Sequence, residues 1–208
     1  MIPAKHTIFH TYFFKYYTEW ILKQNFHDVI IRGDTYKRDK PIFLIGNHFS
    51  WYDGFFALYC NNKCFNKRFY VMMLEEQLKS RIFLRNGGAF GIKKGSRDII
   101  EGLQYTRLLL QNPHNIVAFF PQGQFASLYH YPVTFEPGLV KVLEPFSSAS
   151  IDIIFMVALV DFFAHKKPTL TLNLKYYQLS HTWNKTEIEK DYNTFLKDCI
   201  SKQNPNKF

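Results

Sequence analysis

The chain has 208 residues, with 26 Lys and Arg against 17 Asp and Glu, which gives a formal net charge of +9 at pH 7. This length accommodates one α/β domain with a full hydrophobic core. Aromatic residues make up 18% of the chain, and a basic, aromatic composition indicates nucleic acid or an anionic membrane surface as a partner. No stretch reaches the ~20 apolar residues of a membrane-spanning helix, and charges interrupt the N-terminal apolar positions, so we expect neither a transmembrane helix nor a secretory signal.

Residues 6–24 predict an amphipathic helix, because aromatic residues recur at helical spacing between lysines. The apolar positions are Phe9, Tyr12, Phe13, Tyr16, Tyr17, Trp20 and Ile21, and the lysines are Lys5, Lys15 and Lys23. Such a stripe can cap the domain core, or it can lie in a membrane interface, where aromatic rings and ammonium groups are both favourable. Different faces of one helix can do both. We assign residues 1–25 to this N-terminal segment.

The most informative stretch follows a charged connector. Ile42 to Ile45 is a short apolar run of β-branched and aromatic residues, which predicts a buried strand. Ser50 to Asn61 then predicts a helix. His48 would lie at the carboxyl end of the strand, the edge at which ligands bind in open α/β sheets, and Asp53 would lie in the first helical turn.

Two interpretations of His48 and Asp53 are open. An imidazole beside a carboxylate can act as a general base that takes a proton from a hydroxyl group. Alternatively, Ser50 and Asp53 form an S-x-x-D capping box that serves only the helix start, and His48 is an ordinary loop residue. The spacing alone does not decide between them.

Two glycine-containing segments follow. Gly87 to Gly95 surrounds a short strand that ends in Lys93 and Lys94, and either lysine could face an anion such as phosphate, or the segment is a solvated edge. Phe119 to Gln124 ends a buried strand in a Pro-x-Gly turn. That turn is either an ordinary strand end or a rigid support that presents Gln122 at the ligand-binding edge.

Strands and helices alternate along the rest of the chain. Further predicted strands are Phe26–Arg32, Lys67–Leu74, Phe90–Lys93, Asn115–Phe120 and Ile151–Val160, and further predicted helices are Glu75–Leu84, Arg97–Gln111, Pro137–Phe146 and Thr186–Lys202. Thr169 to Tyr177 alternates polar and apolar residues, which predicts an exposed or edge strand. This order predicts a single α/β domain over residues 26–180, with helices flanking a mainly parallel central sheet, and a closing helix and tail over residues 181–208.

The cysteines give no metal signature. Cys60 and Cys64 lie one helical turn apart, but neither a His nor a second Cys pair stands near them at zinc spacing. We therefore expect thiols in a reducing compartment and no metal site. The chain also lacks a G-x-S-x-G nucleophile elbow, which favours a general base over an enzyme nucleophile.

The order of these segments resembles the glycerolipid acyltransferase family, which includes glycerol-3-phosphate and lysophosphatidate acyltransferases. The resemblance runs from about Phe43 to Leu159, and the family's N-H-x-x-x-x-D block matches Asn47, His48 and Asp53. The resemblance implies transfer of a fatty acyl group from acyl-CoA or acyl-carrier protein to a hydroxyl group of a lysophospholipid or other glycerolipid, without a metal or prosthetic cofactor. It makes His48 the general base and Asp53 the group that fixes its tautomer.

The resemblance also implies the substrate-binding residues and the location. The predicted substrate-binding residues are Asn47, Ser50, Lys93, Lys94, Pro121, Gln122, Gly123 and Gln124. Backbone N–H groups at the start of the Ser50 helix, or in the Gln122-Gly123 turn, are candidate donors to the oxyanion. The protein is expected to be peripheral, at the cytoplasmic face of a membrane.

Departures from the family pattern leave the acceptor open. In the F-P-E-G-T-R block, Gln122 replaces the usual Glu and Phe125 the usual Arg, and Lys94 stands where the G-x-I-P-I-x-R block has Arg. A lysine replaces a bidentate phosphate clamp only in part. A lysophospholipid is the first expectation, and an acceptor without phosphate, such as an amino-acid lipid, a hydroxylated lipid or a pigment, is the alternative.

Two readings from other functional classes are also open. The changes at Gln122 and Phe125, with Met156 where the family has proline, could mark a lipid-binding relative without activity. The positive charge and the aromatic residues could serve a nucleic-acid-binding domain. No predicted helix carries a dense Lys/Arg stripe and no nucleic-acid motif is present, so we expect no nucleic-acid partner.

Overall fold

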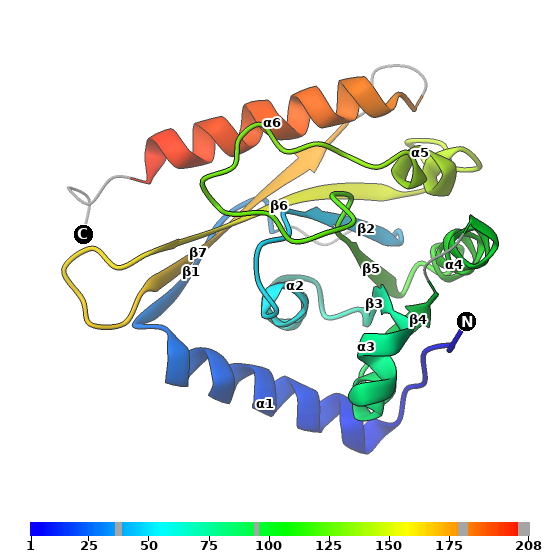
Figure 1. Ribbon diagram of the computed structural model, residues 1–208, viewed down its shortest axis with the longest axis horizontal. Coiled ribbons are helices and arrows are strands. Elements are labelled where there is room, and N and C mark those ends of the chain that lie inside the picture. Colours follow the sequence, from blue (N-terminus) through cyan, green and yellow to red (C-terminus); the bar gives the residue numbers. More distant parts are fainter. Residues whose placement is uncertain (36–38, 94–95, 179–182, 204–208) are drawn as a thin grey trace.

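The computed structural model describes residues 1–35, 39–93, 96–178 and 183–203. Within these ranges the chain forms a seven-stranded sheet with the order β1-β7-β6-β2-β5-β3-β4 and helices on both faces (Figure 1). The strands are β1 (Asp28–Gly33), β2 (Ile42–Gly46), β3 (Arg68–Leu74), β4 (Ala89–Ile92), β5 (Asn115–Phe119), β6 (Asp152–Asp161) and β7 (Thr169–Tyr177). The predicted α/β class is confirmed.

The sheet is mainly parallel. Strands β6, β2, β5, β3 and β4 run in one direction, whereas β7 is antiparallel to β6 and β1 is parallel to β7. The carboxyl ends of β2 and β5 are neighbours, because Ile45 pairs with Phe119. The loops that follow these two strands therefore emerge side by side, although they are far apart in the sequence.

The prediction that Thr169–Tyr177 is an exposed or edge strand was wrong. Strand β7 lies between β6 and β1, and its first six residues are buried. Its polar positions face protein groups instead of water: Asn173 donates a side-chain hydrogen bond to the backbone oxygen of Val157, and Thr171 accepts one from Gln203. The polar alternation predicts solvent exposure, but the segment around α6 covers that face.

Two groups of helices cover the two faces of the sheet. The helices are α1 (Ile8–Asn25), α2 (Asp53–Cys60), α3 (Glu75–Ser80), α4 (Ser96–Leu109), α5 (Gly138–Leu143) and α6 (Lys185–Lys202). Helices α1 and α2 pack on one face with Ile42 and Leu44 of β2, and α4, α5 and α6 pack on the other face with Phe43 and Ile45. Because both faces are covered, every residue of β2 is buried, as its continuous apolar sequence predicts.

Helix boundaries differ from the sequence prediction near the start of α2 and at the end of α3. Helix α2 begins at Asp53 instead of Ser50, and a π-helical turn, Asn61–Phe65, continues it. Helix α3 ends at Ser80 and a 3-10 turn, Ile82–Asn86, replaces its predicted last residues. Residues 48–52 are thus a connecting loop, so His48 lies on a loop while Asp53 is the first residue of α2.

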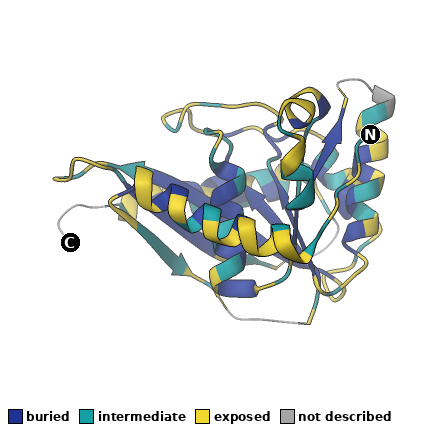
Figure 2. Ribbon diagram, turned by 90° about the horizontal axis from the view of Figure 1, so that it is seen from below, coloured by how far each residue is buried: buried dark blue, intermediate teal, exposed yellow. Residues whose placement is uncertain are grey.

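Helix α1 lies across one face of the molecule with an exposed outer side, as the view from below shows (Figure 2). Its inner side buries Phe14, Thr18, Ile21 and Leu22, of which only Ile21 belongs to the predicted stripe. The aromatic residues of that stripe face mainly outward, so they do not cap the core. Among the described residues, no helix combines the length and the apolar character that a membrane crossing would require.

Candidate active site

The site is built on the loop between β2 and α2. Gly46 is the last residue of β2, and a Cβ atom there would lie 2.9 Å from the Phe120 ring and 3.1 Å from the Met156 methyl group. A glycine is therefore required for the two neighbouring strands and the Phe120 ring to close around this strand end. His48 follows two residues later, at the carboxyl edge of the parallel strands, where the sequence predicts it.

His48 and Asp53 are in direct contact. The imidazole Nδ1 lies 2.7 Å from Asp53 Oδ2, with 23% of the His48 side chain exposed against 1% for Asp53. The same carboxylate oxygen accepts the backbone N–H groups of Phe49 at 2.8 Å and Ser50 at 2.9 Å. Burial raises the pKa of Asp53, and the hydrogen bonds from His48 and from the loop backbone oppose that rise.

The predicted capping box is formed only in part. The Asp53 carboxylate accepts the Ser50 N–H, but the Ser50 hydroxyl accepts the Tyr52 N–H at 3.1 Å, and the N-cap of α2 is Tyr52, which makes no side-chain cap hydrogen bond. The carboxylate also fixes the His48 ring, which a cap alone does not require. The N–H groups of Phe49, Ser50 and Tyr52 are engaged in these bonds, so these three candidate oxyanion donors already have partners.

The loop after β5 holds the backbone of His48. Gln122 Oε1 accepts the His48 N–H at 2.7 Å, and the Ala126 N–H donates to the His48 carbonyl oxygen at 2.9 Å. Gln122 is buried, whereas Gly123 and Gln124 are exposed, and Gly123 has a φ of 68°, which favours glycine in this turn. The predicted Gln122 turn is thus brought against His48, with its amide directed to the backbone.

Two phenylalanine rings pack on the His48 imidazole. The ring of Phe120 is stacked on it with centroids 4.8 Å apart, and the ring of Phe125 lies 4.2 Å away at 35°. Phe125 is half exposed, at 50%, so it forms an aromatic wall next to the imidazole. Sequence reasoning noted Phe125 only as a departure from the family pattern, and no local signal marked it as a neighbour of His48.

Asn47 and Pro121 lie behind the site. The side-chain amide of Asn47 donates to the Ala158 carbonyl oxygen at 2.9 Å and accepts the Ala158 N–H at 2.9 Å. Asn47 is 5% exposed, so its side chain joins the end of β2 to β6. Pro121 is buried, and its carbonyl oxygen accepts the Glu136 N–H at 2.7 Å, which closes the loop on itself.

Of the two predicted lysines, Lys93 is not brought against His48. Lys93 follows β4, at the same edge of the sheet, but β5 and β3 lie between β4 and β2. It lines a hollow of about 130 Å³ together with Leu74, Glu75, Glu76, Lys79 and Ile92. Lys94 lies outside the described residues.

Within the described ranges, no three His, Cys, Asp or Glu side chains come together as metal ligands. The three cysteines are buried, and burial raises the pKa of the Cys60 thiol well above its usual value, so that thiol stays protonated.

The contacts describe an imidazole held by a buried carboxylate at the ligand-binding edge of a parallel sheet, and comparison with known proteins defines the class. A family model described as Acyltransferase matches residues 28–160. The chain therefore belongs to the acyltransferase family and is an acyltransferase enzyme, which confirms the predicted family and enzyme class.

A solved structure with the same fold is the 1-acyl-sn-glycerophosphate (LPA) acyltransferase PlsC from Thermotoga maritima. The TM-score is 0.61 at 12% sequence identity, over 93% of this chain and 79% of that chain. This likeness shows that the two chains share a fold. A comparison with curated proteins gave no match.

Proposed function

We propose that this acyltransferase moves a fatty acyl group from the thioester of acyl-CoA or acyl-carrier protein to a hydroxyl group of a glycerolipid, with a lysophospholipid as the first candidate acceptor. The observation that carries the proposal is the 2.7 Å contact between His48 Nδ1 and the buried Asp53 carboxylate. The family to which the chain belongs supplies the reaction type. No metal or prosthetic group takes part.

The contact with Asp53 supports His48 as the general base. A carboxylate that accepts the Nδ1 proton leaves Nε2 as the basic nitrogen of the neutral ring. Nε2 takes the proton of the acceptor hydroxyl as its oxygen attacks the thioester carbonyl carbon. The new ester C–O bond forms, the C–S bond breaks, and the imidazolium returns its proton to the leaving thiolate. General acid–base catalysis of this kind contributes about 10²- to 10⁴-fold in rate.

The walls of the site support a second candidate acceptor. Phe120 and Phe125 place aromatic carbon on the His48 ring, and the nearby Gln122 is uncharged. Aromatic walls favour an apolar or aromatic group beside the reacting hydroxyl over a phosphate. A hydroxylated lipid, an amino-acid lipid or a pigment without phosphate is therefore the alternative acceptor.

The test is a thioester turnover assay with purified protein, palmitoyl-CoA, and either oleoyl lysophosphatidate or monooleoylglycerol as the acceptor. Released thiol and the acylated product are both measured. We expect His48→Ala to abolish product. His114→Ala is the matched control, because His114 is exposed at the opposite end of β5. Unchanged turnover in His48→Ala would refute the assignment, and the acceptor that gives product chooses between the two candidates.

We also propose that the outer side of α1 rests on an anionic membrane, as a peripheral contact at its cytoplasmic face. Large side chains are exposed there: Phe9 by 73%, Tyr12 by 58%, Phe13 by 43%, Tyr16 by 63% and Trp20 by 57%. Together with Tyr17 they line an almost wholly apolar hollow of about 500 Å³. Aromatic rings with neighbouring lysines are favourable at the level of lipid headgroups.

Ring contacts link this surface to the loop between β2 and α2, which carries His48. Tyr17 of α1 touches Phe55 with ring centroids 5.8 Å apart, and Phe55 touches Trp51 at 5.2 Å. Trp51 lies three residues after His48, and the guanidinium of Arg81 lies 5.2 Å from its ring centroid. This continuity supports the membrane proposal, because a lipid acceptor would then have a short path from the bilayer to His48.

Flotation with vesicles of phosphatidylcholine, with and without phosphatidylglycerol, tests the membrane contact. We expect the wild type to float with the anionic vesicles, and the double variant Tyr16→Ala/Trp20→Ala to stay in the soluble fraction. The control is Ile200→Ala, which removes an exposed apolar side chain from α6, on the opposite face of the sheet. Equal flotation of the double variant and the control would refute the proposal.

A further inference from the structure

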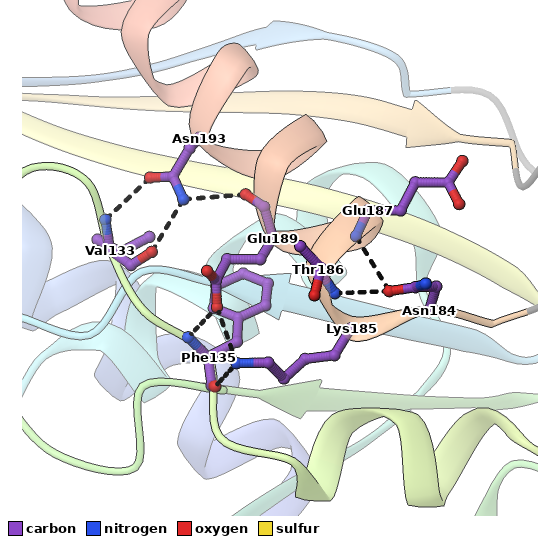
Figure 3. A network of polar contacts seen from close by, with 8 residues as sticks. All are labelled: Val133, Phe135, Asn184, Lys185, Thr186, Glu187, Glu189 and Asn193. Atoms are coloured by element: carbon purple, nitrogen blue, oxygen red, sulfur yellow. Dashed lines mark hydrogen bonds and ion pairs between the residues drawn. The ribbon is translucent and has the colours of Figure 1, made fainter.

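Side chains of helix α6 hydrogen-bond to backbone N–H and carbonyl groups in the loop between β5 and α5 (Figure 3). The Asn193 side chain accepts the Val133 N–H at 2.9 Å and donates to the Val133 carbonyl oxygen at 2.8 Å. Two residues further along, Glu189 accepts the Phe135 N–H at 2.6 Å, and Lys185 donates to the Phe135 carbonyl oxygen at 2.8 Å. The backbone polar groups of these two buried residues are thus satisfied by side chains of one helix.

The same loop between β5 and α5 also hydrogen-bonds to the backbone of His48. Its first part carries Gln122 and Ala126, which bind the N–H and the carbonyl oxygen of His48. Its last part is bound by α6. The loop between β5 and α5 is therefore bonded to the His48 backbone near its start and to helix α6 near its end. A shift of α6 relative to the sheet would be transmitted through this loop to the His48 backbone.

Tyr192 of α6 contacts both the neighbourhood of the end of β2 and the loop between β5 and α5. Its hydroxyl donates to the Met156 carbonyl oxygen at 2.8 Å. Met156 pairs with Gly46 at the end of β2, so this bond lies beside the strand end from which the chain continues to His48. The Tyr192 ring lies 5.3 Å from that of Phe135 in the α6-bound loop.

Burial keeps the Tyr192 hydroxyl protonated, which is the state in which it can donate to the Met156 carbonyl oxygen. The side chain is fully buried, at 0% exposure. Burial raises the pKa of Tyr192 well above its usual value, and the charge of the nearby Asp53 carboxylate adds to that rise. The hydroxyl therefore stays protonated and can donate to Met156 at any pH at which the enzyme would be assayed.

We propose that Tyr192 is a positioning residue for acyl transfer. It fixes the end of β2, from which the chain continues to His48, relative to Phe135 in the loop between β5 and α5. The proposal rests on the function proposed above, because it assumes that His48 is the base. Tyr192 acts through the Met156 backbone, which pairs with Gly46 at the end of β2, and it does not touch the reacting atoms. It lies on α6, beyond the residues 28–160 that match the family model.

The test is Tyr192→Phe, which keeps the ring contacts and removes only the hydroxyl. The hydrogen bond to the Met156 carbonyl oxygen is lost, and a net bond of this kind is worth about 1 kcal/mol. We expect kcat to fall roughly three- to tenfold while the KM for oleoyl lysophosphatidate (or for whichever acceptor the wild type uses) changes less than twofold. Kinetics are measured well below the melting temperature of every variant.

Tyr177→Phe is the matched control. The Tyr192 and Tyr177 rings both pack on Phe155, with ring centroids 5.2 Å and 4.7 Å away. Tyr177 lies on β7, however, and pairs with Ile153, away from the end of β2 that leads to His48. We expect this variant to keep the kcat of the wild type. A Tyr192→Phe enzyme with lowered melting temperature but unchanged kcat, or with a changed KM alone, would overturn the proposal.

A second readout does not depend on turnover. In proton NMR spectra, the His48 Nδ1 proton bonded to Asp53 should give a downfield signal in the wild type. We expect that signal to weaken or broaden in Tyr192→Phe and to persist in Tyr177→Phe, and an unchanged signal would overturn the positioning role. If the wild type itself shows no His48-dependent turnover, the proposed function fails, and this signal still reports separately on what Tyr192 does.

Discussion

Replacing Asp53 with Asn separates two roles of this carboxylate, which are its charge beside the His48 imidazole and its hydrogen bonds to the loop backbone. Asp53 Oδ2 accepts three hydrogen bonds, from His48 Nδ1 and from the N–H groups of Phe49 and Ser50. The amide oxygen of Asn can accept the two backbone bonds, but it carries no charge to stabilise an imidazolium. We therefore expect Asp53→Asn to fold and to lose most of the acid–base contribution, about 10²- to 10⁴-fold in kcat.

Asp53→Ala gives the stability comparison. It leaves the N–H groups of Phe49 and Ser50 without their acceptor, and an unsatisfied buried donor costs about 1–3 kcal/mol. With two such donors, we expect the free energy of unfolding of Asp53→Ala to lie on the order of 2–6 kcal/mol below that of Asp53→Asn. Both variants should lose activity, but only the alanine variant should lose this stability.

The pH dependence of unfolding has a definite sign. Burial raises the pKa of Asp53 in the folded protein above the value of 3.8 expected for an exposed Asp. The folded state therefore binds this proton more tightly, so the wild type loses stability as the pH rises through the folded pKa. Asn does not titrate, and the stability of Asp53→Asn relative to the wild type should increase over the same window.

The assays are thiol release from palmitoyl-CoA in the presence of lipid acceptor and urea unfolding between pH 3 and pH 8. A kcat in Asp53→Asn equal to that of the wild type would refute the reasoning. It would mean that the carboxylate serves only the start of α2, as a helix cap.

Three further predictions concern the surroundings of the site and the sheet. Gln122→Leu removes the acceptor of the His48 N–H and should lower kcat about tenfold, whereas Gln122→Glu keeps the acceptor and should keep the rate, which thiol release measures. Burial and the charge of Arg68 lower the pKa of His6 from 6.5 to about 4, so its stability contribution is complete above pH 6.5 and is lost as the pH falls toward 4. His6→Gln should remove up to about 3 kcal/mol of that pH dependence in urea unfolding. Gly46→Ala places a methyl group 2.9 Å from a neighbouring ring and should lower the free energy of unfolding by about 1–3 kcal/mol, measured by the same method.

Local patterns predicted the elements well where one residue type dominates a short stretch. The apolar run at Ile42–Ile45 is a strand buried on both faces, and the segment of residues 6–24 forms the helix Ile8–Asn25, with its predicted aromatic stripe mainly exposed. The alternation of Thr169–Tyr177 misled the prediction, because polar residues on one side of a strand look the same whether water or another helix covers them. The sequence could not say which segment would lie there.

The sequence by itself determined the spacing of His48 and Asp53, since five positions across a strand end and a tight loop bring the two side chains together by local geometry. Only the tertiary structure decided what surrounds them. Gln122 lies 74 residues from His48 along the chain, and the hydroxyl of Tyr192 meets a carbonyl group 36 residues away. Backbone preferences and side-chain periodicity act over a few residues, whereas these contacts depend on the strand order and on the helix that closes the sheet, which are set by burial of the whole core.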